Sequence, residues 1–378
     1  MRKDTFGLIL CGNGHHQLRD LTFSRSAASV PFGGRYRIID FAMSNMVNSG
    51  VTDVGVVTER NYSSLMDHLG SGAPWDLNRK NGGLFILPPF NSGDASGMFR
   101  GTIDAMNAAM DFIDHMDAYR YCILQRCNAV FNMNFRDMLC QHVETNADIT
   151  CLYCTDPPQR WKNEDMAAEE ARFMLEDGGR IVDMEVDARR PLSQNLFLET
   201  IVIERQLLIY LINEAHGRNA TDFTRDVIQS KLNKLNIYGY RFNGYVGKTN
   251  TIETFFESNL DILNQAISNE LFDRENCIYT KVKNEVPALY RSSSSVKNCM
   301  VADGCIIEGE IENCVLSRSV TIGKGSRMKN CVIMQGSDIQ ENVELENVIL
   351  DKNVTVRRGR RLIGAEGYPI VVRKLTVI

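Results

Sequence analysis

The sequence predicts an α/β domain with a mixed, mostly parallel sheet, followed by a parallel β-helix of hexapeptide-like coils. Residues 1–272 alternate β-rich runs with segments of helical periodicity, which is typical of βαβ units. From residue 296 onward, short aliphatic runs recur at a fixed spacing instead. A chain of 378 residues also exceeds one typical hydrophobic core. We therefore predict a first domain at 1–272, a connector at 273–295 and a β-helix domain at 296–378.

Strands and helices of the first domain are predicted from the spacing of its apolar residues. The strands are expected at 6–10, 51–58, 121–124 and 149–154, and the helices at 39–48, 61–69, 102–115 and 134–143. In a largely parallel sheet, ligands bind beyond the carboxyl ends of the strands. The loops after Leu10 and Leu124 are therefore the expected functional loops.

The second domain is predicted from an internal repeat. The runs ENCVL, KNCVI and ENVIL begin at residues 312, 329 and 346, seventeen residues apart, and a looser copy, KNCMV, begins at 297. Between these runs, aliphatic residues precede turn formers such as Gly and Asn. This pattern is typical of a β-helix in which each coil holds about three short strands. The alternative is a β-sandwich with coincidental spacing, and the register over three copies argues against it.

The composition excludes several classes of partner. Hydrophobic residues make up 44% of the chain, charged residues make up 24%, and the formal net charge is −5. This balance gives no basic surface for nucleic acid or for an anionic membrane, so a small-molecule or protein partner is favoured. The first apolar stretch, at 6–11, is too short for a signal peptide or a membrane span. We expect a cytoplasmic protein.

The eleven cysteines are predicted to be reduced thiols that pack as small hydrophobic residues. Cys151 and Cys154 form a Cys-x-x-Cys pair, but they lie in a strand-like run. Side chains three residues apart on a strand point to opposite faces. We therefore favour packing over a metal or redox role for this pair.

Three motifs in the first domain resemble one known family. A glycine-containing loop, GNGHHQ, follows the first strand at 12–17, and such a loop can bind phosphates through its backbone N–H groups. The runs FGGRYRIIDFAMSN at 32–45 and FRGTIDA at 99–105 follow it, in an order that resembles the ADP-glucose pyrophosphorylase (glucose-1-phosphate adenylyltransferase) family. The resemblance implies a Rossmann-like nucleotidyltransferase domain followed by a left-handed β-helix.

The resemblance also implies a reaction and its requirements. Active members of the family join glucose 1-phosphate to ATP, which gives ADP-glucose and pyrophosphate for glycogen or starch synthesis. The sugar phosphate attacks the α-phosphate, so Mg²⁺ and basic side chains must offset the charge on the phosphate chain. Mg²⁺ in turn needs oxygen ligands, usually carboxylates.

This sequence lacks those groups where it matches the family. Active members have Gly-Gly-x-Gly and two nearby arginines in the first loop, an Arg-x-Lys-Pro stretch, and an aspartate at each of two metal positions. The residues that stand there are Gly12, Asn13, Gly14, His15 and Gln17 in the loop, Ala27 in the stretch, and Asn128 and Lys248 at the metal positions. Neutral histidines cannot replace guanidinium groups, and a lysine repels a metal ion. We therefore predict no catalytic residue, no metal site and no cofactor bound by this chain alone.

Two sets of arginines are candidates for binding a phosphorylated sugar or nucleotide effector. The resemblance places Arg35 in the family's activator site, near the join between the domains. Arg357 and Arg358, in the last coil, are further candidates because guanidinium groups match phosphate geometry. For this second set a solvated turn is the favoured interpretation.

Together these features predict a catalytically degenerate regulatory subunit for glycogen biosynthesis. It would pair with an active ADP-glucose pyrophosphorylase subunit in a hetero-oligomer, with a tetramer as the expected size. The alternative is a weakly active sugar-1-phosphate nucleotidyltransferase. A hexapeptide-repeat acyltransferase is disfavoured, because such enzymes generally need a histidine base on the β-helix and all six histidines lie in the first domain.

Overall fold

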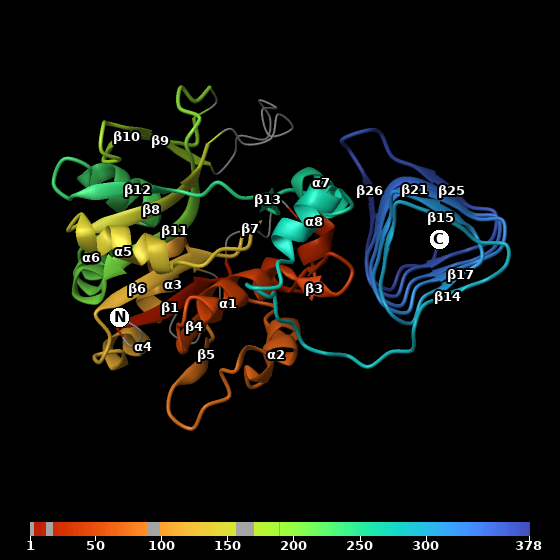
Figure 1. Ribbon diagram of the computed structural model, residues 1–378, viewed down its shortest axis with the longest axis horizontal. Helices are drawn as coiled ribbons and strands as arrows, with labels where there is room; N and C mark the ends of the chain where they lie inside the picture. The colour runs from red at the N-terminus through yellow and green to blue at the C-terminus, as the bar shows by residue number, and fades with distance from the viewer. Residues whose placement is uncertain (1–3, 13–17, 90–98, 156–169, 189) are drawn as a thin grey trace.

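The computed structural model describes residues 4–12, 18–89, 99–155, 170–188 and 190–378. Two domains lie side by side: a sheet with helices on its faces, and a β-helix that is triangular when viewed along its axis (Figure 1). Residues 273–288 connect them and form neither helix nor strand. The predicted order of an α/β domain followed by a β-helix is confirmed.

The sheet of the first domain is mixed, and its centre is parallel. Strand β1 (Thr5–Leu10) pairs in parallel with β4 (Asp53–Val57) and β6 (Tyr121–Arg126), and β4 pairs in parallel with β5 (Gly83–Leu87). Strand β11 (Leu196–Glu204) runs antiparallel to β6 and connects it to β8 (Ile149–Cys154), β9 (Ala171–Leu175), β10 (Ile181–Val186) and β12 (Ile237–Arg241). The parallel centre brings the carboxyl ends of β1, β4 and β6 to one edge.

Shorter elements complete this domain. The helices are α1 (Ile38–Asn48), α2 (Ser63–Leu69), α3 (Thr102–Ala108), α4 (Met110–His115), α5 (Arg136–Glu144), α6 (Arg205–Gly217), α7 (Ile252–Asp261) and α8 (Gln265–Leu271). Single turns are η1 (Arg19–Thr22), η2 (Ala27–Ser29), η3 (Ala73–Trp75), η6 (Phe223–Ile228) and η7 (Gln229–Lys231). Two small antiparallel sheets pair β2 (Pro31–Phe32) with β3 (Tyr36–Arg37) and β7 (Ala129–Val130) with β13 (Gly247–Lys248). None of the helices in the described ranges is long and apolar enough to cross a membrane.

The prediction of one helix over 102–115 is wrong, because the chain breaks it at Ala109. The Ala109 N–H bonds to the Met106 carbonyl, three residues back, at 3.0 Å. This tighter turn separates α3 from α4 and re-aims the following residues. Beyond the break, the Phe112 ring lies where a side chain on Gly55 of β4 would otherwise project.

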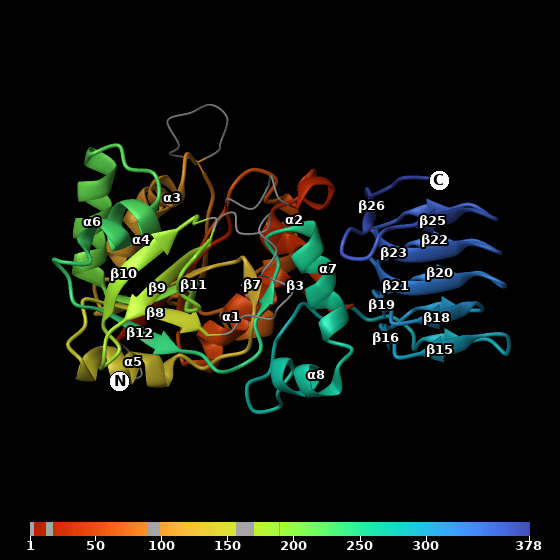
Figure 2. The same ribbon diagram turned by 90° about the horizontal axis from the view of Figure 1, so that it is seen from above.

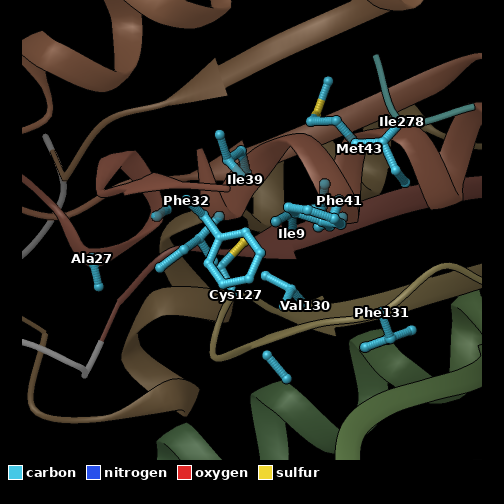
Figure 3. Close-up of a cluster of buried hydrophobic side chains, with 14 of the residues drawn as sticks. Ile9, Ala27, Phe32, Ile39, Phe41, Met43, Cys127, Val130, Phe131 and Ile278 are labelled. Carbon is cyan, nitrogen blue, oxygen red and sulfur yellow. The ribbon is translucent and has the colours of Figure 1, made fainter. Parts of the chain in front are cut away.

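Alternate side chains of the strands enter separate cores on the two faces of the sheet. Ile9 packs in one cluster, together with Phe32, Phe41 and Val130 (Figure 3), whereas Leu8 packs in the other. Cys151 and Cys154 of β8 follow the same rule and lie in different clusters. Burial raises the pKa of both thiols, that of Cys154 to about 11. Their packing role is therefore the one that the alternation predicts.

The residues of the 32–45 motif shape a turn and a helix start. Gly33 and Gly34 have φ of 58° and 78° between β2 and β3, a left-handed conformation that favours glycine. At the start of α1, the Asp40 carboxylate accepts a hydrogen bond from the Arg37 backbone N–H at 2.9 Å. Asp40 thus satisfies a backbone N–H at the start of the helix.

The second domain is a left-handed parallel β-helix with three faces. One face holds β14 (Leu289–Tyr290), β17 (Ile306–Ile307), β20 (Thr321–Ile322), β22 (Asp338–Ile339) and β24 (Thr355–Val356). The second face holds β15 (Ser295–Lys297), β18 (Glu310–Glu312) and β25 (Arg361–Ile363). The third face holds β16 (Met300–Val301), β19 (Val315–Leu316) and β26 (Ile370–Val372). Two longer strands, β21 (Arg327–Ile333) and β23 (Glu344–Leu350), run from the second face into the third. The named strands all pair in parallel, which argues against the sandwich alternative. Strand β14 already pairs with β17, so the first coil begins before residue 296.

The repeated asparagines explain the fixed spacing. Asn298, Asn313, Asn330 and Asn347 all adopt left-handed conformations, with φ from 47° to 52°. Their side chains stack from coil to coil: Asn298 Nδ2 donates to Asn313 Oδ1 at 2.8 Å, and Asn330 Nδ2 to Asn347 Oδ1 at 3.2 Å. Asparagine tolerates this conformation and satisfies its own amide there, so it marks the same corner in successive coils.

Buried contacts join the two domains. Val315, Val332 and Ile349 of the β-helix belong to the same apolar cluster as Ile9. Figure 2 shows β26 on the side of the β-helix that faces the first domain. At this junction the buried side chains of Arg25 and Asp351 form an ion pair.

Candidate functional site

The predicted functional loops meet at the carboxyl edge of the parallel strands. The Cys127 N–H, after β6, bonds to the Leu10 carbonyl at 3.0 Å, and the Cys11 N–H bonds to the Val57 carbonyl at 3.0 Å. Gly12 therefore lies beside the ends of both neighbouring strands. Asn13, Gly14, His15 and Gln17 lie outside the described residues.

A carboxylate that the sequence analysis missed lies against the first loop. A side chain on Gly12 would place its Cβ 2.1 Å from Glu59 Oε1, and Glu59 is buried. The Glu59 side chain therefore fills the space beside Gly12. Glu59 comes directly after Thr58 at the end of β4, so its place at the sheet edge was a signal that could have identified it.

The structure brings the two predicted metal positions together. In the small β7–β13 sheet, Lys248 pairs with Ala129, the residue after Asn128. The Thr249 N–H also donates to the Asn128 carbonyl at 3.0 Å. Two positions 120 residues apart in the sequence therefore form one site.

An ion-pair network occupies the Lys248 position. The Lys248 ammonium is 7% exposed and forms an ion pair with Glu170, whose carboxylate also bonds to Arg172 at 3.0 Å. Burial lowers the pKa of Lys248, and the Glu170 carboxylate opposes that shift. Two cations and one carboxylate thus lie where the family resemblance implies a metal carboxylate.

A second network surrounds Asn128. Its amide nitrogen contacts Glu199, which also forms an ion pair with Arg126. Glu199 has φ of 46°, at a β-bulge between Phe197 and Ile201. Such strained residues in bulges commonly re-aim a side chain at functional sites. The Asn128 amide oxygen is buried and has no hydrogen-bond partner among the described residues.

These residues do not fit Mg²⁺. The ion needs hard oxygen ligands, and the site offers an ammonium group together with an amide whose nitrogen faces Glu199. The nearby carboxylates, Glu170 and Glu199, are each engaged by cations of the chain itself. In the part of the chain that the structure describes, no group of three or more His, Cys, Asp or Glu side chains is arranged to hold a metal.

The stretch that contains Ala27 serves packing. Ala27 is buried in η2 and belongs to the core cluster below the loops. Arg25, two residues earlier, turns away from the sheet edge to its ion pair with Asp351. Ala27 therefore puts a core contact where the family resemblance implies a lysine, and Arg25, the arginine of that stretch, makes a junction contact.

Arg35 lies in a basic pocket at the domain junction. The cations that line it are Arg35, Arg37, Lys281, Lys283, Arg318 and Lys352. Arg318 is buried, and its Nε and Nη2 have no hydrogen-bond acceptor among the described residues. Burial lowers the pKa of Lys352 to about 7, and the positive charge of Arg37 adds to this effect. Lys281 lies 3.3 Å from Asp67, but the Arg318 nitrogens, lying among the other cations, make the pocket suitable for a multiply charged anion.

Arg357 and Arg358 do not line this pocket. Both are exposed on a turn after β24, and Arg358 lies 3.6 Å from Glu341 of the preceding coil. Their suggested contribution to an effector site with Arg35 therefore has no support in this geometry. The solvated-turn interpretation fits their positions.

Comparisons with known proteins agree with both domains. The Nucleotidyl transferase family matches residues 6–162, and the family described as GlmU-like, C-terminal hexapeptide, matches residues 286–367. The chain is 33% identical over 319 residues to the glycogen biosynthesis protein GlgD of Bacillus subtilis (strain 168), covering 83% of this chain and 79% of that one. It is also 33% identical over 333 residues to the glucose-1-phosphate adenylyltransferase of Mycoplasma mobile, covering 86% and 84%, and 32% identical over 335 residues to that of Geobacillus stearothermophilus, covering 87% and 84%.

Proposed function

We propose, because this chain belongs to the glucose-1-phosphate adenylyltransferase family, that it is a catalytically degenerate regulatory subunit of glycogen biosynthesis. The observation that supports the proposal best is the ion pair of Lys248 with Glu170 beside Asn128. On this proposal an active subunit makes ADP-glucose from ATP and glucose 1-phosphate. This chain assembles with that subunit in a hetero-oligomer, for which a tetramer is expected.

The charges at the sheet edge argue against catalysis by this chain alone. Attack on the α-phosphate builds negative charge that must be met by cations available to the substrate. Three cations of this site, Lys248, Arg172 and Arg126, form ion pairs with carboxylates of the chain. Glu59 adds a buried negative charge beside the first loop.

The junction pocket supports a regulatory role. A phosphorylated sugar or nucleotide bound beside Arg35 and Arg318 would contact the first domain and the β-helix at once. Such a ligand can shift an assembly equilibrium only when it binds the alternative arrangements with different affinity. A pocket between two domains supplies that difference whenever the domains move relative to each other.

The experiment compares the purified chain, an active subunit from the same organism, and their mixture. ADP-glucose formation is measured with Mg²⁺ and saturating substrates, and light scattering establishes whether the two chains are bound together. We expect no turnover by the chain alone, and a changed turnover or effector response in the complex. Kinetics of the bound complex identical to those of the active subunit would leave a scaffolding role only.

The alternative, a weakly active nucleotidyltransferase, is distinguished with variants. The Lys248→Ala and Asn128→Ala chains serve as controls, because each alters the degenerate site without touching the junction pocket. Turnover by the pure chain that disappears in both variants would establish the alternative. Turnover that persists unchanged in both would indicate a contaminating enzyme.

A further inference from the structure

One face of the β-helix is open and carries two rows of charges. The charged face consists of residues 295–297, 310–312, 327–329, 344–346 and 361–363, one segment from each coil. The third face packs on the first domain, whereas the strands of the charged face lie away from it (Figure 1). Its first row is Ser295, Glu310, Arg327, Glu344 and Arg361, and its second row is Lys297, Glu312, Lys329, Glu346 and Ile363.

The sign of the charge alternates from coil to coil in both rows. The second row reads positive, negative, positive, negative from Lys297 to Glu346, and the first row reads negative, positive, negative, positive from Glu310 to Arg361. Between the rows runs a groove of about 250 Å³, with Ile311, Met328 and Leu345 in its floor. The face of β14, β17, β20, β22 and β24 shows no such alternation, since its row from residue 306 contains Ile, Thr, Asp and Thr.

Contacts within the chain account for the first row only. Arg327 Nε lies 3.5 Å from Glu310, and Arg361 Nε lies 2.8 Å from Glu344. The four charges of the second row, Lys297, Glu312, Lys329 and Glu346, make no ion pair with any residue in the described ranges. Within one molecule these four charges only neighbour opposite charges in the adjacent coils, so their side chains remain available to a second molecule.

The pattern is complementary to itself in one orientation. A two-fold axis that lies in the contact plane along the strands reverses the order of the coils and makes each row face itself. Lys297 then meets Glu346 of a second copy, and Glu312 meets Lys329 of that copy. A two-fold axis along the β-helix instead makes the two rows face each other within each coil. That orientation puts Glu310 against Glu312, and Arg327 against Lys329, so like charges oppose it.

We propose that a second copy of this chain docks on the charged face, with the two β-helices antiparallel. The second-row charges fix the register, because all four of them gain an opposite charge only when Lys297 lies opposite Glu346 and Glu312 lies opposite Lys329. This inference goes beyond the proposed function and does not rest on it. Because the face is exposed and its pairs are ionic, the association weakens as salt rises.

Charge reversals at one contact test the proposal. Lys329→Glu and Glu312→Lys each put like charges across the interface and also between neighbouring coils of one chain. Each variant alone is expected to self-associate at least about tenfold more weakly than the natural chain in about 50 mM salt. Mixing the two variants restores opposite charges between molecules but leaves the repulsion within each chain. We expect the mixture, measured by sedimentation equilibrium, to regain most of the lost affinity.

Two controls complete the experiment. Asp338→Lys changes a charge on the face of β22 and should leave self-association unchanged. Carbodiimide treatment of the natural chain needs no variant to fold, and should join Lys297 to Glu346 in a dimer; these residues are three coils, or about 14 Å, apart within one chain. A monomeric natural chain in low salt, a variant mixture no tighter than its components, or the absence of that cross-link from the dimer would each overturn the proposal.

Discussion

Two regions of this molecule bring cations together, and they differ in how completely carboxylates of the chain pair with those cations. At the sheet edge, Lys248 and Arg126 form ion pairs with the carboxylates Glu170 and Glu199. At the domain junction, six cations line one pocket, and Arg318 has nitrogen atoms without an acceptor among the described residues. At the sheet edge these cations are paired with carboxylates, whereas at the junction Arg318 keeps donors that can bind an anion. On the proposed function, the difference means that loss of the chemistry and loss of anion binding are separate events in this fold.

The largest expected effect comes from the buried ion pair of Arg25 with Asp351 at the junction. Asp351→Ala leaves the Arg25 guanidinium buried without its partner, which we expect to lower the free energy of unfolding by about 3–5 kcal/mol. The matched control is Asp20→Ala, which removes a more exposed pair across the same junction, Arg373 to Asp20 at 2.5 Å. That change should cost only about 0–1 kcal/mol. Denaturant unfolding of both variants measures the difference, and equal losses would contradict it.

The second effect compares one cation from each region. Lys248→Met leaves Glu170 buried with Arg172 as its remaining partner, and we expect a loss of about 2 kcal/mol. Arg318→Met removes a buried charge whose Nε and Nη2 lack acceptors, so stability should stay within about 0.5 kcal/mol of the natural chain or rise. Thermal unfolding without added anions distinguishes the two cases. A larger loss of stability for Arg318→Met than for Lys248→Met would show that the Arg318 charge is compensated in the folded chain.

The third effect concerns anion binding. Arg318→Met and Arg35→Ala should each weaken the binding of sulfate or a sugar bisphosphate about tenfold, because each removes a charged donor from the pocket. Lys248→Met and Arg358→Ala are the controls, since neither side chain lines it. Isothermal titration calorimetry measures the affinities, and the same variants can be assayed in the complex with an active subunit. Equal affinity in all four variants would place the anion elsewhere.

Much of this architecture could be predicted because local sequence specifies it. The repeated Asn-Cys and Asn-Val pairs mark the corners at which Asn313, Asn330 and Asn347 take left-handed conformations. The apolar runs fix β1, β6 and β8 almost to the residue. Asn128 and Lys248 could be assigned to one site because family motifs register both positions.

The networks around those two positions could not be predicted, because tertiary contacts determine them. Glu170 approaches Lys248 from β9's side of the sheet, and Glu199 reaches Asn128 only because a bulge holds it in a left-handed conformation. No pattern of spacing marks either residue. Arg25 shows the same limit, since its partner Asp351 is 326 residues away in the β-helix.

The smallest effect is a pH dependence of anion binding at the junction. The folded-state pKa of Lys352 lies at about 7, below the value of about 10.4 for an unfolded chain. Between these two pKa values the unfolded state binds more protons at Lys352 than the folded state does. The contribution of Lys352 to stability without anions should therefore rise with pH in this window. An anion favours the protonated side chain, and its affinity should therefore fall by a few-fold from about pH 6 to about pH 8. Sulfate is the suitable probe because its own charge is constant over this range.

His68 also lines the pocket, and burial lowers its pKa, so its contribution to the slope is tested separately. Lys352→Met should bind sulfate more weakly at pH 6 and with an affinity that no longer changes with pH. His68→Gln is the matched control and should retain the slope of the natural chain. A pH dependence that survives in Lys352→Met and vanishes in His68→Gln would contradict this prediction. It would show that the proton coupled to anion binding is carried by His68 and not by Lys352.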